Sequence, residues 1–232
     1  MLEVKMIGII AAMDEEHKEI LNIMEETYIE KNFEKEFVIG KINNTKCILA
    51  KSGVGKVNSA RTTQLLIDKY DIDGIINVGS AGALNENLNY GDIVISTSCV
   101  QHDFDITCFN HPKGYITDIG VEIKASSELI ELLENAIIKI DKSINIVKGI
   151  IATGDQFYNS PQIKRTLRET FNAECDDMEG AAIAQVCTLC NKPFVIVRSI
   201  SDKPKSEEKV DFYEYLEMAS KRCAKMLSEA LK

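Results

Sequence analysis

The segment FVIVRSISD, residues 194–202, decides the fold, because four apolar residues in a row precede a polar end. In this run, as in residues 7–12 and 75–78, apolar side chains occupy both alternating faces, which is typical of strands covered by helices on both sides. Similar runs alternate with helical patterns along the chain, as in βαβ units. The sequence therefore predicts an α/β fold: a single domain, residues 1–232, with a central mixed, mostly parallel β-sheet flanked by helices.

Apolar residues at helical spacing predict the helices, which we expect at residues 14–25, 56–69, 126–140, 160–170, 179–190 and 211–231. The last of them is expected to pack on the sheet. Residues 102–120 form the one long irregular stretch, and such loops in compact domains tend to be functional or to contact another subunit.

Composition and charge exclude several kinds of partner. The chain has 232 residues, 45% of them hydrophobic, and a net charge of −9, which repels nucleic acid and anionic membranes. No apolar stretch is long enough to span a bilayer, and the start of the chain lacks a secretory signal. Seven scattered cysteines suit a reducing compartment, and Cys187 and Cys190 are interpreted as buried thiols rather than metal ligands. We expect a soluble, cytoplasmic protein without nucleic-acid or membrane partners.

Ligands of open α/β sheets bind beyond the carboxyl ends of the strands, so these ends are the first places to inspect. They carry the motifs AAMDEE (11–16), KSGVGKVNSA (51–60), NVGSAGA (77–83) and RSISD (198–202). The glycines of the middle two allow backbone N–H groups to approach an oxygen-rich ligand closely. Neither motif has the spacing of a dinucleotide or phosphate-loop fingerprint.

Three carboxylates stand where a solvated charge is not expected. Glu16 lies on the apolar stripe of the first predicted helix, Glu179 shares a helix face with small and apolar residues, and Asp202 follows the buried 194–202 run. A single inward carboxylate is more often a capping or ion-paired structural acid. Three of them at separate strand ends favour a functional site.

These motifs, together with YGDIVIS (90–96), TGDQFY (153–158) and DDMEGAAIA (176–184), resemble those of bacterial 5′-methylthioadenosine/S-adenosylhomocysteine nucleosidases, in the same order and spacing over nearly the whole chain. This family belongs to the purine nucleoside phosphorylase superfamily. The resemblance implies a nucleoside phosphorylase-like fold and a hydrolase that releases adenine from both nucleosides, in methionine salvage and the recycling of S-adenosylmethionine by-products. It further implies a homodimer that uses no cofactor and no metal.

The resemblance assigns a role to each of the three acids. Glu16 would activate water, Asp202 would protonate adenine at N7, and Glu179 would bind the ribose hydroxyls. The chemistry suits this assignment, because adenine leaves poorly as an anion and needs an acid at N7 while the sugar becomes cation-like. The two catalytic acids therefore need environments that keep them in different protonation states.

The remaining substrate contacts are also implied by the resemblance. Phe157 would stack on adenine, the backbone of Tyr158 would read the edge of the base, and Ser201 would help to hold Asp202. Further substrate-binding residues are Met178, Ser80, Ala81 and Gly82 around the sugar and base, Met13, Val54 and Phe212 around the 5′ substituent, and Arg198. For Met178 and Phe212 alone, a place in the core is favoured over a substrate contact.

Some positions depart from the family pattern. Asp177 stands where Glu is usual and Gly180 where Ala is common, and FNHPKGYITDIG (109–120) lacks the proline-glycine turn of a loop that enters the neighbouring subunit's 5′ pocket. The 5′ specificity is therefore open. Potential metal ligands in this loop are His102, Asp103, Asp105 and His111, for which a polar loop or an interface is the favoured interpretation.

Three other functions stay open on sequence grounds. A phosphorylase needs cations for phosphate, and the connection at residues 11–20 carries acids instead, leaving Arg61 and Arg198 as alternatives. A hydrolase of an adenine-bearing futalosine would share base and sugar recognition. A ligand-sensing module of the same fold is disfavoured, because all three acids to which the resemblance assigns a catalytic role are present.

Overall fold

Ten strands form one sheet in the part of the chain that the structure, a computed structural model, describes: residues 6–202 and 212–232. They are β1 (Met6–Ala11), β2 (Glu25–Asn32), β3 (Lys35–Ile42), β4 (Thr45–Lys51), β5 (Gly74–Ala83), β6 (Ile93–Gln101), β7 (Ile123–Lys124), β8 (Ile146–Thr153), β9 (Ala173–Asp177) and β10 (Phe194–Asp202). Pairs such as β1–β5 and β5–β10 are parallel, whereas β5–β9 and β6–β10 are antiparallel. The predicted mixed α/β sheet is confirmed.

Five strands of the sheet close on one another. β5 pairs with β9 and β10, β6 pairs with β8 and β10, and β8 pairs with β9, while β1, β4, β3 and β2 extend the sheet beyond β5. In this arrangement Gly82 of β5 is in register with both Asp176 of β9 and Asp202 of β10. The closure thus brings three strand ends from distant parts of the sequence to one point.

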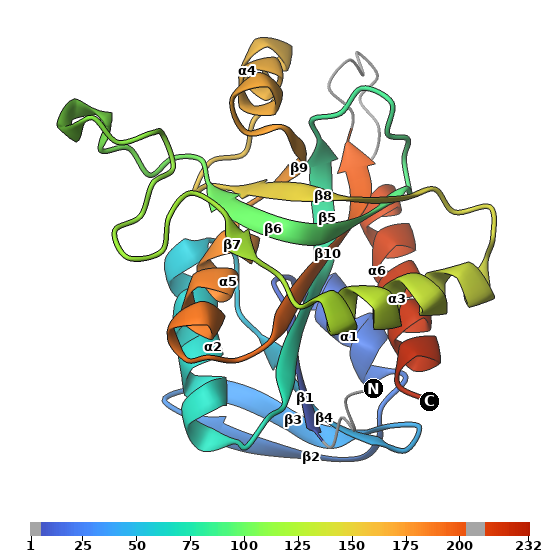
Figure 1. Ribbon diagram of the computed structural model, residues 1–232. Coiled ribbons are helices and arrows are strands. Elements are labelled where there is room, and N and C mark those ends of the chain that lie inside the picture. The colour runs from blue at the N-terminus through green and yellow to red at the C-terminus, as the bar shows by residue number, and fades with distance from the viewer. Residues whose placement is uncertain (1–5, 203–211) are drawn as a thin grey trace.

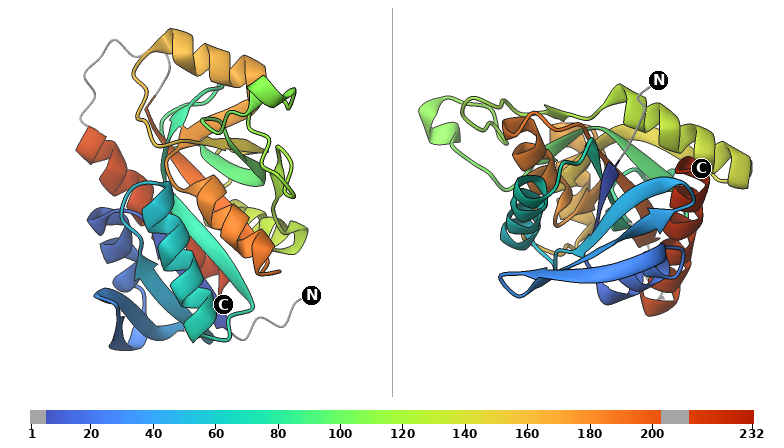
Figure 2. Two further views of the ribbon diagram at one scale, coloured as in Figure 1. Left: turned by 90° about the vertical axis from the view of Figure 1, so that its left-hand side faces the viewer. Right: turned by 90° about the horizontal axis from the view of Figure 1, so that it is seen from below.

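Helices cover both sides of the sheet (Figure 1). They are α1 (Asp14–Leu21), α2 (Lys56–Lys69), α3 (Ser127–Ile140), α4 (Pro161–Phe171), α5 (Gly180–Leu189) and α6 (Phe212–Ala230), with a short 3₁₀ turn η1 (Thr107–Phe109). α2 packs on α5 on one side, and α6 packs on α1 and α3 on the other (Figures 1 and 2). α4 covers the ends of β8 and β9.

The core explains why the strand ends are rigid. Every residue of β10 from Phe194 to Ser201 is buried, and so is nearly all of β5. Ile9 and Val197 belong to the apolar cluster beneath α1, α3 and α6, whereas Ile10 and Ile196 belong to the cluster beneath α2 and α5. Burying one such side chain contributes about 1.5–3 kcal/mol, so the strands that end at the site are firmly anchored.

Several element boundaries differ from the prediction. The first helix ends at Leu21 rather than residue 25, and the chain turns into β2, whose charged, exposed sequence hides its role as an edge strand. β9 was not predicted, because its five residues, AECDD, are too short and acidic to mark a strand. The fifth helix begins at Gly180, which makes Glu179 its N-cap residue rather than part of a helix face.

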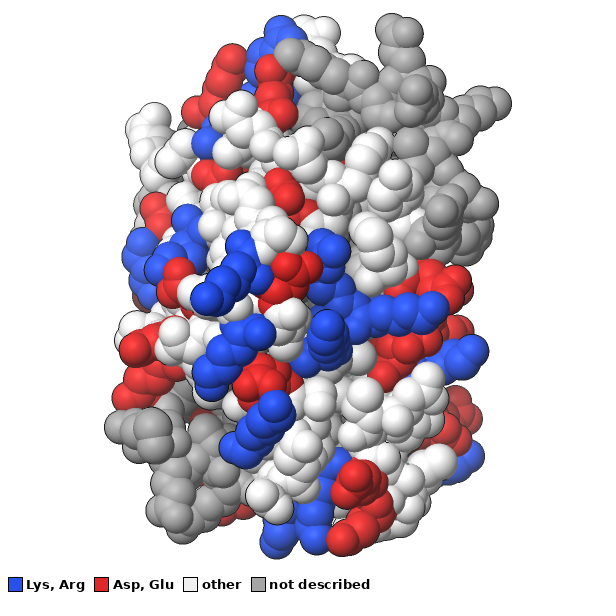
Figure 3. Space-filling model, turned by 90° about the vertical axis from the view of Figure 1, so that its right-hand side faces the viewer, with Lys and Arg blue, Asp and Glu red and all other residues white. Residues whose placement is uncertain are grey.

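On the face that carries α3 and α6, basic and acidic side chains are interspersed (Figure 3). Within residues 6–202 and 212–232, no helix is both long and apolar enough to cross a membrane.

Candidate active site

The predicted site residues meet in one pocket at the carboxyl ends of β1, β5 and β10. The pocket is lined by Met13, Glu16, Val54, Ser80, Ala81, Gly82, Phe157, Tyr158, Met178, Glu179, Arg198, Ser201 and Asp202. Phe212 is the first residue of α6, and its side chain lies outside the described residues. The structure therefore gathers all the predicted side chains that it describes, and their roles remain predictions.

Glu16 is fixed at one end of this pocket by backbone donors. Its Oε2 accepts hydrogen bonds from the backbone N–H groups of Ala12 (2.9 Å) and Met13 (3.0 Å), and its Oε1 accepts one from Ser80 (3.1 Å). The side chain is 3% exposed, and this burial raises the pKa of Glu16 above its ordinary value, opposed by the backbone donors and by Arg198. A carboxylate with a raised pKa is a better proton acceptor than an exposed one.

Glu179 lines the same pocket as Glu16, and the charges of the two carboxylates interact. Glu179 Oε1 accepts a hydrogen bond from the backbone N–H of Gly55 (2.9 Å), in the glycine-containing turn that precedes α2. Gly55 has φ 99°, a conformation that a residue with a side chain rarely adopts. Burial is the main reason that the pKa of Glu179 rises to about 7, and the Asp177 charge adds to it.

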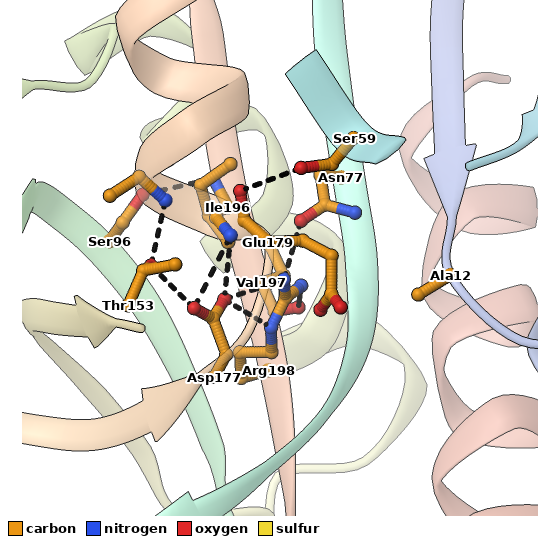
Figure 4. A network of polar contacts seen from close by, with 12 residues as sticks. Ala12, Ser59, Asn77, Ser96, Thr153, Asp177, Glu179, Ile196, Val197 and Arg198 are labelled. Carbon is orange, nitrogen blue, oxygen red and sulfur yellow. Dashed lines mark hydrogen bonds and ion pairs between the residues drawn. The ribbon is translucent and has the colours of Figure 1, made fainter. Parts of the chain in front are cut away.

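A buried network connects this end of the pocket to the strands (Figure 4). Arg198 Nε and Nη2 lie 2.9 and 2.6 Å from Asp177 Oδ2, and Nη2 also donates to Asn77 Oδ1 at 2.6 Å. Asp177 in turn accepts a hydrogen bond from the Thr153 hydroxyl (2.5 Å) and one from the backbone of Gly180. The guanidinium is therefore committed to Asp177 and Asn77 and holds the end of β9 against β10.

Asp202 stands at the opposite end of the pocket, and side chains hold it. The Lys164 ammonium donates to Asp202 Oδ2, and the Ser201 hydroxyl lies 3.4 Å from Asp202 Oδ1. Ser201 also donates to the Ala81 carbonyl oxygen (3.3 Å). Asp202 is 27% exposed at its side chain, so a ligand in the pocket can reach it.

The mouth of the pocket is apolar. Phe157 and Val54 are 59% and 47% exposed, although both line the cavity. Tyr158 is half-buried and packs near the ring of His102. Exposed apolar groups around a polar floor suit a flat aromatic ligand whose polar edge points inward.

Sequence reasoning missed three charged residues of the pocket, Lys164, Asp176 and Asp177. Lys164 lies on the inward face of α4 with Leu167 and Phe171, and a lysine on an apolar stripe is a signal that the sequence contained. Asp176 carried no such signal, because its position depends on the pairing of β9 with β5.

The 102–120 loop packs against the start of α2. Asp103 accepts hydrogen bonds from Lys56 Nζ (2.6 Å) and from the backbone N–H of Asp155 (3.0 Å), while His111 stacks on Tyr115. Among the residues described, no group of three or more potential metal ligands lies together.

Comparison with known proteins identifies first the class and then the family. Residues 6–232 match the model of the phosphorylase superfamily, so the chain is a member of this class of α/β proteins. It is 40% identical to the 5′-methylthioadenosine/S-adenosylhomocysteine nucleosidase of Bacillus cytotoxicus over 97% of this chain and 98% of that protein. The chain belongs to the family of 5′-methylthioadenosine/S-adenosylhomocysteine nucleosidases, and the predicted resemblance is confirmed.

Solved structures agree with this assignment. The nucleosidase of Neisseria meningitidis in complex with methylthio-immucillin-A has a TM-score of 0.92 and 33% identity, covering 98% of this chain and 99% of that one. A futalosine hydrolase mutant of Helicobacter pylori has a TM-score of 0.91 and 33% identity, covering 98% of each chain. The fold is therefore shared by enzymes described by two different nucleoside substrates.

Proposed function

We propose that this protein hydrolyses the N-glycosidic bond of 5′-methylthioadenosine and S-adenosylhomocysteine and releases adenine. One observation carries the proposal: the pocket holds carboxylates at its two ends in different environments, Glu16 among backbone donors and Asp202 beside an ammonium and a hydroxyl. Acids with separated environments are what a reaction needs when one side protonates and the other accepts a proton.

At the Asp202 end, the proposed reaction begins with the base. Phe157 stacks on adenine at the pocket mouth, the backbone of Tyr158 reads its edge, and Asp202 donates a proton to N7 as the C1′–N9 bond lengthens. Ser201 supports this role, because its hydroxyl bridges Asp202 and the Ala81 carbonyl. Protonation makes adenine a neutral leaving group and is typically worth about 10²–10⁴ in rate.

At the Glu16 end, the proposed reaction captures the sugar. Glu16 orients a water molecule, takes its proton and stabilises the positive charge that develops on the ribose. Glu179 accepts hydrogen bonds from the ribose hydroxyls, supported by its position in the same pocket as Glu16 and by the Gly55 contact that fixes it. Met13, Val54, Ser80, Ala81, Gly82, Met178 and Phe212 would enclose the sugar and its 5′ group.

Water is favoured over phosphate as the nucleophile. Arg198 lines the pocket but is paired with Asp177, and Arg61 donates to the Phe33 carbonyl outside it. We therefore assign Arg198 to holding the site rather than to binding an anion. Glu16 would repel a phosphate at the place where the attacking group must stand.

Release of adenine in buffers with and without phosphate tests the function. We expect the purified protein to release adenine from 5′-methylthioadenosine and S-adenosylhomocysteine without phosphate, and at an unchanged rate with a chelator present. Strict dependence on phosphate would make the protein a phosphorylase. An adenine-bearing futalosine serves as the comparison substrate. A clear preference for it would favour futalosine hydrolysis as the function.

We further propose that the protein acts in the cytoplasm, in methionine salvage, as a homodimer that joins the 102–120 loop and the start of α2 across its interface. Val57 and Phe109, in these two segments, are 79% and 73% exposed, which supports burial against a partner. Light scattering across a dilution series measures whether the dimer forms. The Michaelis constant, measured over the same dilutions, should rise as the dimer dissociates. A monomer with full activity would contradict it.

A further inference from the structure

Lys164 is an unusually buried lysine beside the proposed acid. Its side chain is 3% exposed, on the inward face of α4. Lysines are rarely buried unless they are paired, because removing the ammonium from water is costly. Its ammonium donates to Asp202 Oδ2 and lies 4.0 Å from Asp176 Oδ1, so it stands between two carboxylates.

Asp176 is the second carboxylate of this cluster, and the reaction described above does not use it. Among the described residues, no donor is hydrogen-bonded to its buried Oδ1. Burial is the main cause that raises the pKa of Asp176 to about 7, with the charges of Asp202 and Asp177 adding to it and that of Lys164 opposing it. At neutral pH Asp176 therefore holds a proton in a large share of the molecules.

Gly82 leaves the space in which these groups meet. A Cβ atom at this position would lie 2.6 Å from Asp176 Oδ1, 2.7 Å from Lys164 Nζ and 3.0 Å from Asp202 Oδ2. Three charged groups from β9, α4 and β10 thus converge on one point, within reach of a small movement of the lysine side chain. Lys164, Asp176 and Asp202 together form the acid cluster.

The charges of the acid cluster are balanced when it carries one extra proton. One ammonium and two carboxylates give a net negative charge, which a proton on either carboxyl group neutralises. The Lys164 ammonium donates to Asp202, whereas no donor among the described residues is hydrogen-bonded to Asp176 Oδ1, so we place the proton on Asp176. Catalysis needs the opposite distribution, with the proton on Asp202.

We propose that Asp176 stores the proton used in the reaction and that Lys164 is a positioning residue that relays it to Asp202 when the base binds. This inference rests on the proposed function, in which Asp202 protonates the leaving adenine. In the relay, Lys164 first gives one of its protons to Asp202, and the neutral amine that results turns toward Asp176 and takes the proton of its carboxyl group. The ammonium is thereby restored beside the new Asp176 carboxylate.

The relay then connects to bond cleavage. Asp202 gives the proton to adenine N7 while the electron pair of the C1′–N9 bond goes to the base, and Asp176 takes a proton from solvent before the next turnover.

The other charged groups around Asp176 are committed elsewhere or uncharged at neutral pH. Asp177 is paired with Arg198, Glu174 with Arg168, and burial raises the pKa of Tyr158.

Rates measured across pH with two substrates test the relay. Asp176→Asn removes the store but leaves Lys164 on Asp202, so adenine release at neutral pH should fall by about tenfold or more, and the activity lost at high pH should be lost about one pH unit lower. Lys164→Met removes both the relay and the positive charge beside Asp202, so adenine release at neutral pH should also fall, whereas the activity that remains should be lost at higher pH than in the wild type. A nitrophenyl riboside, whose leaving group needs no proton, should be cleaved by both variants at near wild-type rates.

The opposite directions of the two shifts separate a relay from a structural role. Wild-type pH profiles in both variants, or equal losses on both substrates at every pH, would overturn the relay. If Asp176→Asn does not fold, infrared spectra of Glu179→Gln decide, because Glu179 also titrates at about 7 and its removal leaves the signal of Asp176: a protonated-carboxyl band that disappears around pH 7 is expected in this variant. Its absence would also overturn the relay.

The same experiment distinguishes failure of the relay from failure of the proposed function. No adenine release by the wild-type protein, or normal release by Asp202→Asn, would refute the function or its acid. Adenine release that depends on Asp202 but keeps its pH profile in Asp176→Asn and Lys164→Met would refute only the relay.

Discussion

The two ends of the pocket hold their carboxylates in different ways. Backbone N–H groups of Ala12, Met13 and Ser80 fix Glu16, whereas the side chains of Lys164 and Ser201 contact Asp202. Backbone donors cannot titrate or turn away, but a lysine side chain can move and exchange a proton. The Glu16 end is therefore suited to one fixed geometry, and the Asp202 end is suited to proton transfer.

The largest expected effect separates the chemical roles of the carboxylates at the two ends of the pocket. Asp202→Asn keeps the shape of the side chain but cannot donate a proton, so we expect adenine release to fall about 10²–10⁴-fold while adenine still binds. A nitrophenyl riboside should recover much of this loss. Turnover of both substrates, measured beside adenine binding by calorimetry, checks the prediction.

Glu16→Gln is the matched control for this experiment. Its proposed role lies on the water side, so its loss should be similar for both substrates, whatever the leaving group. Recovery by the nitrophenyl riboside in Glu16→Gln, or near-normal adenine release in Asp202→Asn, would show that the two ends have been assigned wrongly.

The next effect concerns the buried ion pair of Arg198 and Asp177 in the network at the Glu16 end. Arg198→Met leaves Asp177 as a buried charge without its partner, and we expect a loss of about 3–5 kcal/mol in the free energy of unfolding. The two side chains are only 2% and 1% exposed, so water cannot replace the lost contact. Urea denaturation of the variant measures the loss.

An exposed ion pair provides the control for this loss. Lys31 and Glu36 have side chains that are 70% and 53% exposed, so Lys31→Met should leave the denaturation midpoint close to that of the wild type. Equal midpoints for Arg198→Met and Lys31→Met would mean that the buried network does not stabilise this end of the pocket.

A smaller effect concerns how the free energy of unfolding depends on pH. The carboxyl of Glu179 titrates at about 7 in the folded protein and near 4.5 when exposed, so between these values the folded state holds a proton that the unfolded chain has released. Its contribution to stability is therefore lost as pH rises through this window, by on the order of 3 kcal/mol. Glu179→Gln, which keeps an oxygen for the Gly55 N–H, should lack that part of the pH dependence.

Unfolding free energies of both proteins at pH 5 and pH 8 give the measurement. Glu179 interacts with Asp177 and Glu16, so the difference between the two proteins reports Glu179 together with its effect on these neighbours. An identical pH dependence in wild type and variant would show that this carboxyl is not perturbed by burial.

Much of this pocket could be predicted from the sequence, because strand ends are easy to locate. The apolar runs end at Ala11, Ala83 and Asp202 in the structure, so the motifs at these ends were expected to meet. The family motifs then supplied roles that spacing alone does not give. What escaped prediction depends on tertiary pairing.

The missed residues show this limit in physical terms. Asp176 reaches the pocket only because β9 pairs with the end of β5, and a five-residue acidic strand has no periodic signal. Sequence reasoning did not place the charge of Lys164 in the pocket, where the Asp202 carboxylate compensates for its burial. Likewise, β2 forms as an exposed edge strand because β3 offers it a partner.

The smallest expected effect tests the mouth of the pocket, which belongs to neither end. Val54 lines the cavity but is 47% exposed, so Val54→Ala removes contacts that water already shares. We expect at most about 1 kcal/mol, or up to about fivefold, in kcat/KM, with the change in KM and not in kcat. Steady-state kinetics with 5′-methylthioadenosine and with adenosine separate the contributions, because a contact to the 5′ group should matter more for the first substrate. A fall in kcat would mean that Val54 acts on the reaction itself, and the division of the pocket into two reactive ends and a passive mouth would then fail.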